Sequence, residues 1–423
     1  MKKHKLLYFL LLAIMVFISA CGQGTQKTAS NEAASSDKPK ETAQQSEQPK
    51  NNGDAGNKAQ ETVKIGAILP YSGVYASLGE NLTKGMELYF ESVNWQAGGK
   101  KIELIKEDEE NDPQASLRKF RKLVDQDKID ILTGTVSTAV AYALRDEVNS
   151  KQVPYLVAHA GGDDLTRSKR SDYIWRSSFN SWQIGTSMGQ YAYGHIAKKV
   201  YLAAADYAFG KEVSKAFKKA FTDAGGEIVG EVYPPLGSND YASYLTQIKS
   251  AKPEAVYSFF AGSDAVRFVK QYEQYGLKGK ITLIGSGWLN AEDIRPATGN
   301  SGEGVVSTMF WDYGMQTPEN KAFVDAYEKK YNSRPSIESV EGYDAARMIV
   351  EVFNNLKGDT SDKKKVSDEF GKVSFASPRG PLKLDPETHH VIQNLHVFKT
   401  VIKDGKTENE FVETVGEFKD PGK

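Results

Sequence analysis

The stretch IDILTGTVSTAVAYALRDEVNSKQVPYLV (residues 129–157) carries the pattern that determines the fold class. It begins with a short apolar run at 129–133 and ends with another at 153–157, and each has the length of a buried strand. The residues between them, up to Ser150, are expected to form a helix. A strand, a helix and a second strand in this order predict a parallel β-sheet covered by helices.

The same order extends in both directions from this stretch. Further strands are predicted at 63–69, 102–105, 200–204, 228–233, 255–259 and 281–284. Helical patterns lie between them at 79–90, 113–124, 183–196, 211–224, 241–250 and 264–275. This repeat predicts an α/β protein with two doubly wound, Rossmann-like parallel sheets in tandem.

The C-terminal third follows a different pattern. A strand is predicted at 305–311, helices at 319–331 and 339–356, and an antiparallel hairpin from 381–384 and 395–401. The second α/β unit is thus followed by additional helices and a hairpin. This indicates a chain that crosses back and forth between two lobes.

We therefore assign 63–180 with 306–375 to lobe 1, and 181–305 with 376–423 to lobe 2, joined by a multi-strand hinge. In open α/β sheets, ligands bind outside the carboxyl ends of the strands. The expected ligand site is thus a cleft shared by the two lobes.

The N-terminus has the build of a secretory signal peptide, predicted over residues 1–20. Basic residues precede an apolar run at 6–18, which ends in the small residues Ser19 and Ala20. The sequence ending at Cys21 resembles the lipobox of bacterial lipoproteins, so Cys21, the only cysteine, is the expected lipidation site. The alternative is an ordinary secretory signal. Residues 21–62 are almost entirely polar and are predicted to be a disordered tether.

Composition and motifs argue against several functions. The formal net charge is -1, which gives no strongly basic face, so nucleic acid is not an expected partner. The sequence contains no G-x-G-x-x-G after a strand, no Walker A motif, no H-E-x-x-H and no G-x-S-x-G. Without paired histidines on a helix face or mature thiols beyond Cys21, a metal site is not predicted. We expect neither an enzyme nor a cofactor.

Several short motifs occur in an order that resembles a known family. They are Pro70-Tyr71-Ser72-Gly73, Gly134-Thr135-Val136-Ser137-Thr138, Asp206-Tyr207, Gly342-Tyr343-Asp344-Ala345 and Arg379-Gly380-Pro381-Leu382. In this order they resemble type I solute-binding proteins of ATP-driven (ABC) importers, the leucine/isoleucine/valine-binding group. The resemblance implies the type I periplasmic-binding-protein fold and a monomer that works with permease and ATPase subunits.

The resemblance also implies where the carboxylate of a ligand is held. The positions fall on Ser137 and Thr138 and on the loop His159-Ala160-Gly161. Hydroxyl groups and free backbone N–H groups at a helix N-terminus bind an anion, and glycine allows close approach. Ser137 and Thr138 are also expected to cap the following helix. His159 is expected to be a second donor or part of the pocket wall.

Two departures from the family pattern bear on the ligand. Gly161 stands where branched-chain amino-acid binders generally have a threonine. The stretch Gly285-Ser286-Gly287-Trp288 lacks the glutamate that holds the ammonium in those relatives. A buried ammonium needs a counter-charge, so an amino-acid ligand would require Asp206 or Asp264 as a substitute.

Aromatic side chains accumulate in the loops after the predicted strands. Tyr71, Trp182, Tyr207, Phe260 and Trp288 are therefore predicted to line the ligand site, with core packing as the alternative for each. The sequences at 160–166, 179–183 and 259–271 are similar to those of the family's aromatic-carboxylate-binding subgroup.

The sequence thus predicts a lipid-anchored, extracytoplasmic binding protein that captures a small hydrophobic or aromatic carboxylate. An amino-acid ligand is the first alternative. The ligand domain of a sensor and an extracellular hydrolase are alternatives from other classes.

Overall fold

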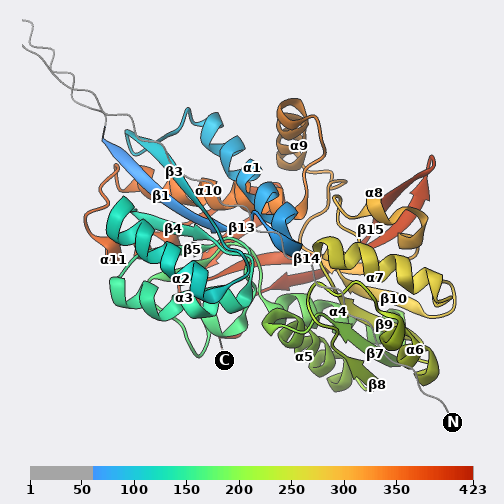
Figure 1. Ribbon diagram of the computed structural model, residues 1–423. Coiled ribbons are helices and arrows are strands. Elements are labelled where there is room, and N and C mark those ends of the chain that lie inside the picture. The colour runs from blue at the N-terminus through green and yellow to red at the C-terminus, as the bar shows by residue number, and fades with distance from the viewer. Residues whose placement is uncertain (1–60, 423) are drawn as a thin grey trace, which may run out of the picture. The chain divides into compact units, whose positions relative to one another are not determined.

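The computed structural model describes residues 61–422, and the predicted signal peptide, Cys21 and most of the tether lie outside them (Figure 1). The first strand series comprises β1 (Thr62–Leu69), β2 (Gln96–Ala97), β3 (Lys100–Asp108), β4 (Ile131–Gly134), β5 (Tyr155–Val157) and β6 (Ile174–Arg176). Its order is β2-β3-β1-β4-β5-β6, and all neighbours except β2 and β3 are parallel. The connecting helices are α1 (Ala76–Ser92), α2 (Pro113–Lys122) and α3 (Thr138–Lys151).

The second strand series repeats this arrangement. Its strands are β7 (Lys199–Ala204), β8 (Glu227–Val232), β9 (Ala255–Phe259), β10 (Thr282–Ser286) and β11 (Val306–Met309). They are parallel in the order β11-β10-β9-β7-β8. The helices are α4 (Ser181–His195), α5 (Ala208–Asp223), α6 (Ala242–Ala251), α7 (Gly262–Gln274) and α8 (Arg295–Thr298). The predicted α/β fold with parallel sheets is confirmed.

Local sequence signals explain where several helices begin. Asp112 accepts hydrogen bonds from the N–H groups of Gln114 and Ala115, and Pro113 occupies the first turn of α2, where its missing N–H costs nothing. Asn180 caps α4 by accepting from Gln183 N–H. These caps fix the start of α2 shortly after β3 and the start of α4 shortly after β6.

The C-terminal third adds α9 (Pro318–Tyr331), α10 (Ile337–Asn355), α11 (Lys363–Glu369), β12 (Ser374–Ser377), β13 (Gly380–Asp385), β14 (His390–Lys403) and β15 (Lys406–Phe418). Helix α10 packs closely against α1, since a Cβ on Gly342 would lie 2.0 Å from the carbonyl oxygen of Leu82. A Cβ on Gly85 would likewise lie 1.9 Å from the carbonyl oxygen of Ser339. The two helices can approach this closely only because both positions are glycine.

Strand β14 connects the two strand series (Figure 1). His390 at its start pairs with Arg176 of β6, and Phe398 pairs with Ser307 of β11. The predicted hairpin of 381–384 with 395–401 is wrong in its second strand, because β13 pairs antiparallel with 390–392 of β14, whereas 395–401 pairs with β15 and β11. The longest partner of β14, however, is β15, which the sequence pattern did not reveal. The division into lobes at 306 and 376 stays a prediction.

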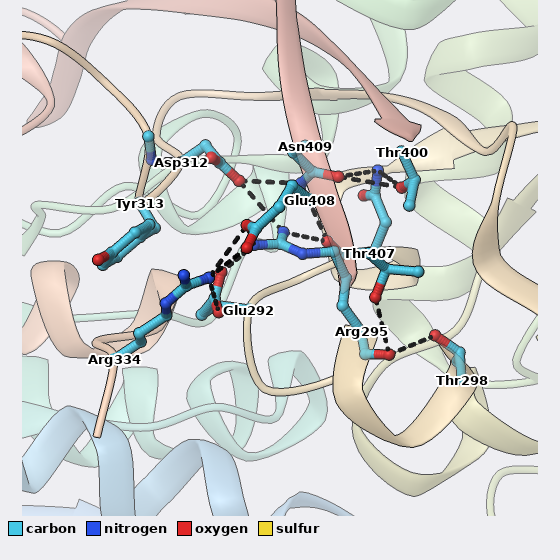
Figure 2. Close-up of polar contacts among 12 residues, drawn as sticks. Glu292, Arg295, Thr298, Asp312, Tyr313, Arg334, Thr400, Thr407, Glu408 and Asn409 are labelled. Atoms are coloured by element: carbon cyan, nitrogen blue, oxygen red, sulfur yellow. Dashed lines mark hydrogen bonds and ion pairs between the residues drawn. The ribbon is translucent and has the colours of Figure 1, made fainter. Parts of the chain in front are cut away.

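A charged cluster attaches β15 to the segments around α8 and before α10 (Figure 2). Buried Arg295 donates to Asp312 Oδ2 at 3.3 Å and pairs with Glu292. Arg334 bridges Glu292 and Glu408, at 3.1 Å and 2.9 Å. We call these five residues the Arg295 cluster.

Candidate functional site

A small cavity lies where the carboxyl ends of strands from both series converge. The segments that follow strands of the first series, including the first turn of α1, contribute Tyr75, Leu78, Val136, His159, Gly161 and Phe179. The second series contributes Tyr207, Phe209, Phe259, Ala261 and Trp288. The volume of the cavity is only about 10 Å³, room for about one water molecule, because the side chains of the wall pack against one another. A larger ligand could enter only if these side chains, or the two strand series, move apart.

Aromatic rings form most of the cavity wall. The ring centroids of Phe179 and Trp288 are 4.7 Å apart, and those of Phe209 and Phe259 are also 4.7 Å apart. The rings are tilted or edge-to-face, as the charge distribution of aromatic rings favours. Gly161 lies against them, since a Cβ there would be 2.3 Å from the ring of Phe209. The wall therefore offers mainly apolar ring faces and edges to a ligand.

His159 is a polar group of the cavity wall, and its partner is a buried carboxylate. Its Nδ1 lies 2.6 Å from Glu341 Oε2, and both side chains are buried. Burial acts to lower the pKa of His159, but the charge and hydrogen bond of Glu341 outweigh it and the pKa is raised. Within the described residues Nε2 has no hydrogen-bond partner, so it is the ring nitrogen left for a ligand.

The N-terminus of α3 already holds an internal carboxylate. Glu109 accepts from Val136 N–H at 2.6 Å and from Ser137 N–H at 2.8 Å. Burial raises the pKa of Glu109 to about 7, although the two N–H groups act to lower it. The Ser137 side chain makes no capping hydrogen bond, so the predicted cap is wrong for that side chain. The Thr138 hydroxyl is buried without a partner in the described part of the chain.

Comparison with known proteins identifies the family. The model of the periplasmic binding proteins matches residues 62–406. The chain belongs to the periplasmic binding protein family. A Leu/Ile/Val-binding protein homolog 6 from Brucella melitensis is 32% identical over 369 residues, which cover 86% of this chain and 94% of that relative. The predicted family is therefore confirmed, and this periplasmic binding protein is not an enzyme.

Two solved structures of ABC transporter solute-binding proteins are similar to this binding protein. One, from R. palustris in complex with benzoate, has 34% identity and a TM-score of 0.79, and the match covers 84% of this chain and 96% of that one. The other, from Rhodopseudomonas palustris BisB5 in complex with 3,4-dihydroxybenzoic acid, has 33% identity and a TM-score of 0.81, with 85% and 99% covered.

Four of the predicted site residues line the cavity of this binding protein: His159, Gly161, Tyr207 and Trp288. Ala160 is buried beside them, but its N–H donates to the carbonyl oxygen of Thr135 at 3.0 Å. The expected role of Ala160 N–H as a free anion donor is therefore wrong. The N–H of Gly161 has no acceptor within residues 61–422 and remains available.

Three predicted aromatics lie elsewhere. The Tyr71 hydroxyl is 2.8 Å from Thr83 Oγ1, beside α1. Trp182 lies in an open groove beside α4 and α5. Phe260 packs in the core against Phe268, with ring centroids 4.3 Å apart, while its neighbour Phe259 faces the cavity. The alternative of core packing describes the fully buried Phe260, and Tyr71 and Trp182 are partly buried against the same core.

The two candidate counter-charges for an ammonium are already paired. Asp206 forms an ion pair with Lys211 at 2.6 Å, and Asp264 pairs with Arg267 and accepts from Gly237 N–H. Neither lines the cavity. The cavity wall therefore presents no carboxylate to a ligand.

Sequence reasoning missed Tyr75 in the cavity wall and the two glutamates behind it, Glu338 and Glu341. Tyr75 follows Pro70-Tyr71-Ser72-Gly73, a motif that already marked this loop. The glutamates lie on a helix whose pattern is otherwise ordinary, and no local signal distinguishes them. No group of three or more potential metal-binding side chains, and no helix with the length and apolarity of a membrane span, occurs in residues 61–422.

Proposed function

We propose that this chain is the ligand-binding component of an ABC importer and captures a small aromatic carboxylate such as benzoate. The observation that carries the proposal is the composition of the cavity wall. It combines aromatic rings with His159 and the free N–H of Gly161, and it presents no carboxylate. An aromatic ring would pack between Phe179, Phe209 and Trp288, and the carboxylate would accept from His159 Nε2.

The relatives support this ligand class. The two similar binding proteins from Rhodopseudomonas palustris hold benzoate and 3,4-dihydroxybenzoic acid. Their ligands share a single ring with one carboxylate, which agrees with a wall that combines aromatic rings with His159 and the N–H of Gly161. Ligand contacts made by both strand series would stabilise the closed arrangement of the two predicted lobes, which the permease would recognise.

An amino acid remains the second candidate because a relative is named as a Leu/Ile/Val-binding protein homolog. Its ammonium would need a buried counter-charge. Asp206 and Asp264 are paired with Lys211 and Arg267, and Glu341 is engaged by His159. The benzoate class avoids this requirement.

A thermal-shift comparison of benzoate, 4-hydroxybenzoate, leucine and phenylalanine tests the proposal. A ligand at 100 times its Kd stabilises the protein by about 2.7 kcal/mol, which raises the melting temperature measurably. We expect a rise with the two acids that lack an amine. Stabilisation by leucine alone would overturn the aromatic-acid proposal and favour the amino-acid reading.

We further propose that Cys21 is lipidated and that residues 21–62 tether a monomeric binding protein to the outer face of the cytoplasmic membrane. A single acyl-modified cysteine after a signal peptide explains the position of the only thiol. Cys21→Ala should release the protein from the membrane fraction of expressing cells. Retention of the variant in that fraction would contradict the anchor.

A further inference from the structure

Two glutamates on α10 stand behind the cavity wall, and each holds one of the rings that line it. Trp288 Nε1 donates to Glu338 Oε1 at 3.0 Å, and His159 Nδ1 lies 2.6 Å from Glu341 Oε2. Residues three apart on a helix share a face, which brings both carboxylates to the same side of α10. Both side chains are buried.

Glu341 is only half satisfied. Its Oε2 contacts His159, but its Oε1 is buried and has no hydrogen-bond partner in residues 61–422. If Glu341 were ionised, its buried Oε1 would have lost its water without gaining a hydrogen bond in return. This favours the protonated form of Glu341. Burial raises the pKa of Glu341 to about 7, with His159 acting in the opposite direction.

The charges that face this pair are mostly negative. The negative charges of Glu338 on α10 and Glu109 after β3 raise the pKa of His159, and Glu338 also raises that of Glu341. The opposing positive charge is Arg379 after β12, which lowers the pKa of Glu341. Arg379 is itself paired with Asp344 at 2.7 Å. A further acid, the partly exposed Asp293, interacts with Glu338, and desolvation together with that charge raises the pKa of Asp293 to about 8. An anionic ligand would add another negative charge to this surplus.

We propose that a carboxylate ligand enters the cavity together with one proton, which the His159–Glu341 pair takes up from solvent. This inference rests on the proposed function. In the occupied site His159 is an imidazolium whose Nε2–H donates to the ligand carboxylate, and Glu341 is a neutral carboxylic acid with its proton on the side of Oε1. Glu341 acts as a positioning residue, since it fixes the imidazole and stores the proton without touching the ligand.

Calorimetry of benzoate binding tests the inference directly on the full-length protein. Titrations at pH 7.5 in phosphate, HEPES and Tris, which differ in ionisation enthalpy, give the number of protons taken up per ligand. We expect uptake approaching one at pH 7.5 and falling toward zero at pH 5.5, where the pair already holds both protons. The Kd should rise by up to about tenfold per pH unit above neutrality.

The outcomes separate this inference from the proposed function. Benzoate binding with zero proton uptake from pH 6 to 8.5 would overturn the inference and leave the function standing. No benzoate binding at any pH would overturn the proposed function, and this inference with it.

Two variants locate the proton. The double variant His159→Gln/Glu341→Gln keeps groups able to hydrogen-bond but cannot titrate, so proton uptake should be lost and the Kd should become independent of pH. Asp130→Asn is the control, because Asp130 precedes β4, at the end of the strand away from the cavity, and pairs with Lys363 at 3.2 Å, so uptake should persist there. Uptake that persists in the double variant, or disappears in Asp130→Asn, would place the proton elsewhere and overturn the inference. If the double variant fails to bind, the wild-type titrations still decide.

Discussion

Arg379 Nε lies 2.7 Å from Asp344 Oδ2, and both side chains are almost completely buried. The guanidinium also donates to the carbonyl oxygens of Ser177 and Ser178, which lie between β6 and α4. This pair therefore fastens α10 to the connection between the two strand series.

We predict that Asp344→Asn lowers the free energy of unfolding by about 3–5 kcal/mol, because it leaves the guanidinium of Arg379 buried without a counter-charge. Urea unfolding followed by fluorescence and circular dichroism measures the change. Asp325→Asn is the matched control, since Asp325 forms an exposed ion pair with Lys321 and its loss should change little. Equal effects of the two substitutions would contradict this role of the buried pair.

The Arg295 cluster provides a rank order of stability effects (Figure 2). The side chain of Arg295 is 2% exposed and that of Arg334 is 36% exposed. Removing Arg295 leaves Asp312 with less compensation for its burial, whereas Glu408 can still be hydrated when Arg334 is removed. Arg295→Met should therefore destabilise the protein more than Arg334→Met in urea unfolding. The reverse order would show that burial does not govern this cluster.

Glu109 makes stability depend on pH with a defined sign. Its pKa of about 7 in the folded protein exceeds the ~4.3 of an unfolded glutamate, so between these values the folded state binds more protons. The contribution of Glu109 to the free energy of unfolding is fully present below the unfolded pKa and is lost as the pH rises through about 7. In Glu109→Gln the free energy of unfolding should therefore fall less steeply as the pH rises toward 7. Urea unfolding at several pH values from 4.5 to 8 measures it, and unchanged slopes would contradict it.

Gly161 tests whether the cavity depends on close approach of the backbone. In Gly161→Ala the new Cβ would come within 2.3 Å of the Phe209 ring and 2.6 Å of the Phe179 ring, so both rings must shift. We expect at least tenfold weaker benzoate binding by calorimetry. Gly194→Ala is the control, because nothing lies within 4 Å of a Cβ on that residue of α4. Binding that is unchanged in Gly161→Ala would remove this residue from the site.

The sequence pattern predicted the strands that are buried on both faces, since these form continuous apolar runs such as β1 and β9. It did not reveal β15, which is rich in glutamate and largely exposed and depends on pairing with β14. Nor could it distinguish Phe259 from Phe260, because only the orientation of the strand end decides which ring faces the cavity.

The glutamates behind the cavity show a different limit. Glu341 lies 182 residues from His159 in the chain, and a helical glutamate is normally exposed. Only the packing of α10 against the loop after β5 brings the two side chains together. His159 and Gly161, by contrast, could be predicted because they directly follow an apolar strand and include a glycine, and both signals are visible in the local sequence.

Tyr75 offers a test of ligand selectivity. Tyr75 is 2% exposed and lines the cavity beside Tyr207, with ring centroids 6.1 Å apart, and its buried hydroxyl has no partner at normal hydrogen-bond geometry in residues 61–422. A buried hydroxyl without a partner costs about 1–3 kcal/mol, so a second polar group on the ligand would be favoured there. We predict that Tyr75→Phe keeps benzoate affinity but reduces the preference for 4-hydroxybenzoate over benzoate by about tenfold.

Calorimetry with both acids measures this ratio of Kd values. Tyr257→Phe is the control, because the Tyr257 hydroxyl is also buried without a partner in the described residues but its ring stacks on Phe217, away from the cavity. The ratio should be unchanged in that variant, since the hydroxyl it removes cannot meet a ligand. Equal changes in the two variants would mean that a general effect on the protein, and not contact with the ligand, sets the preference.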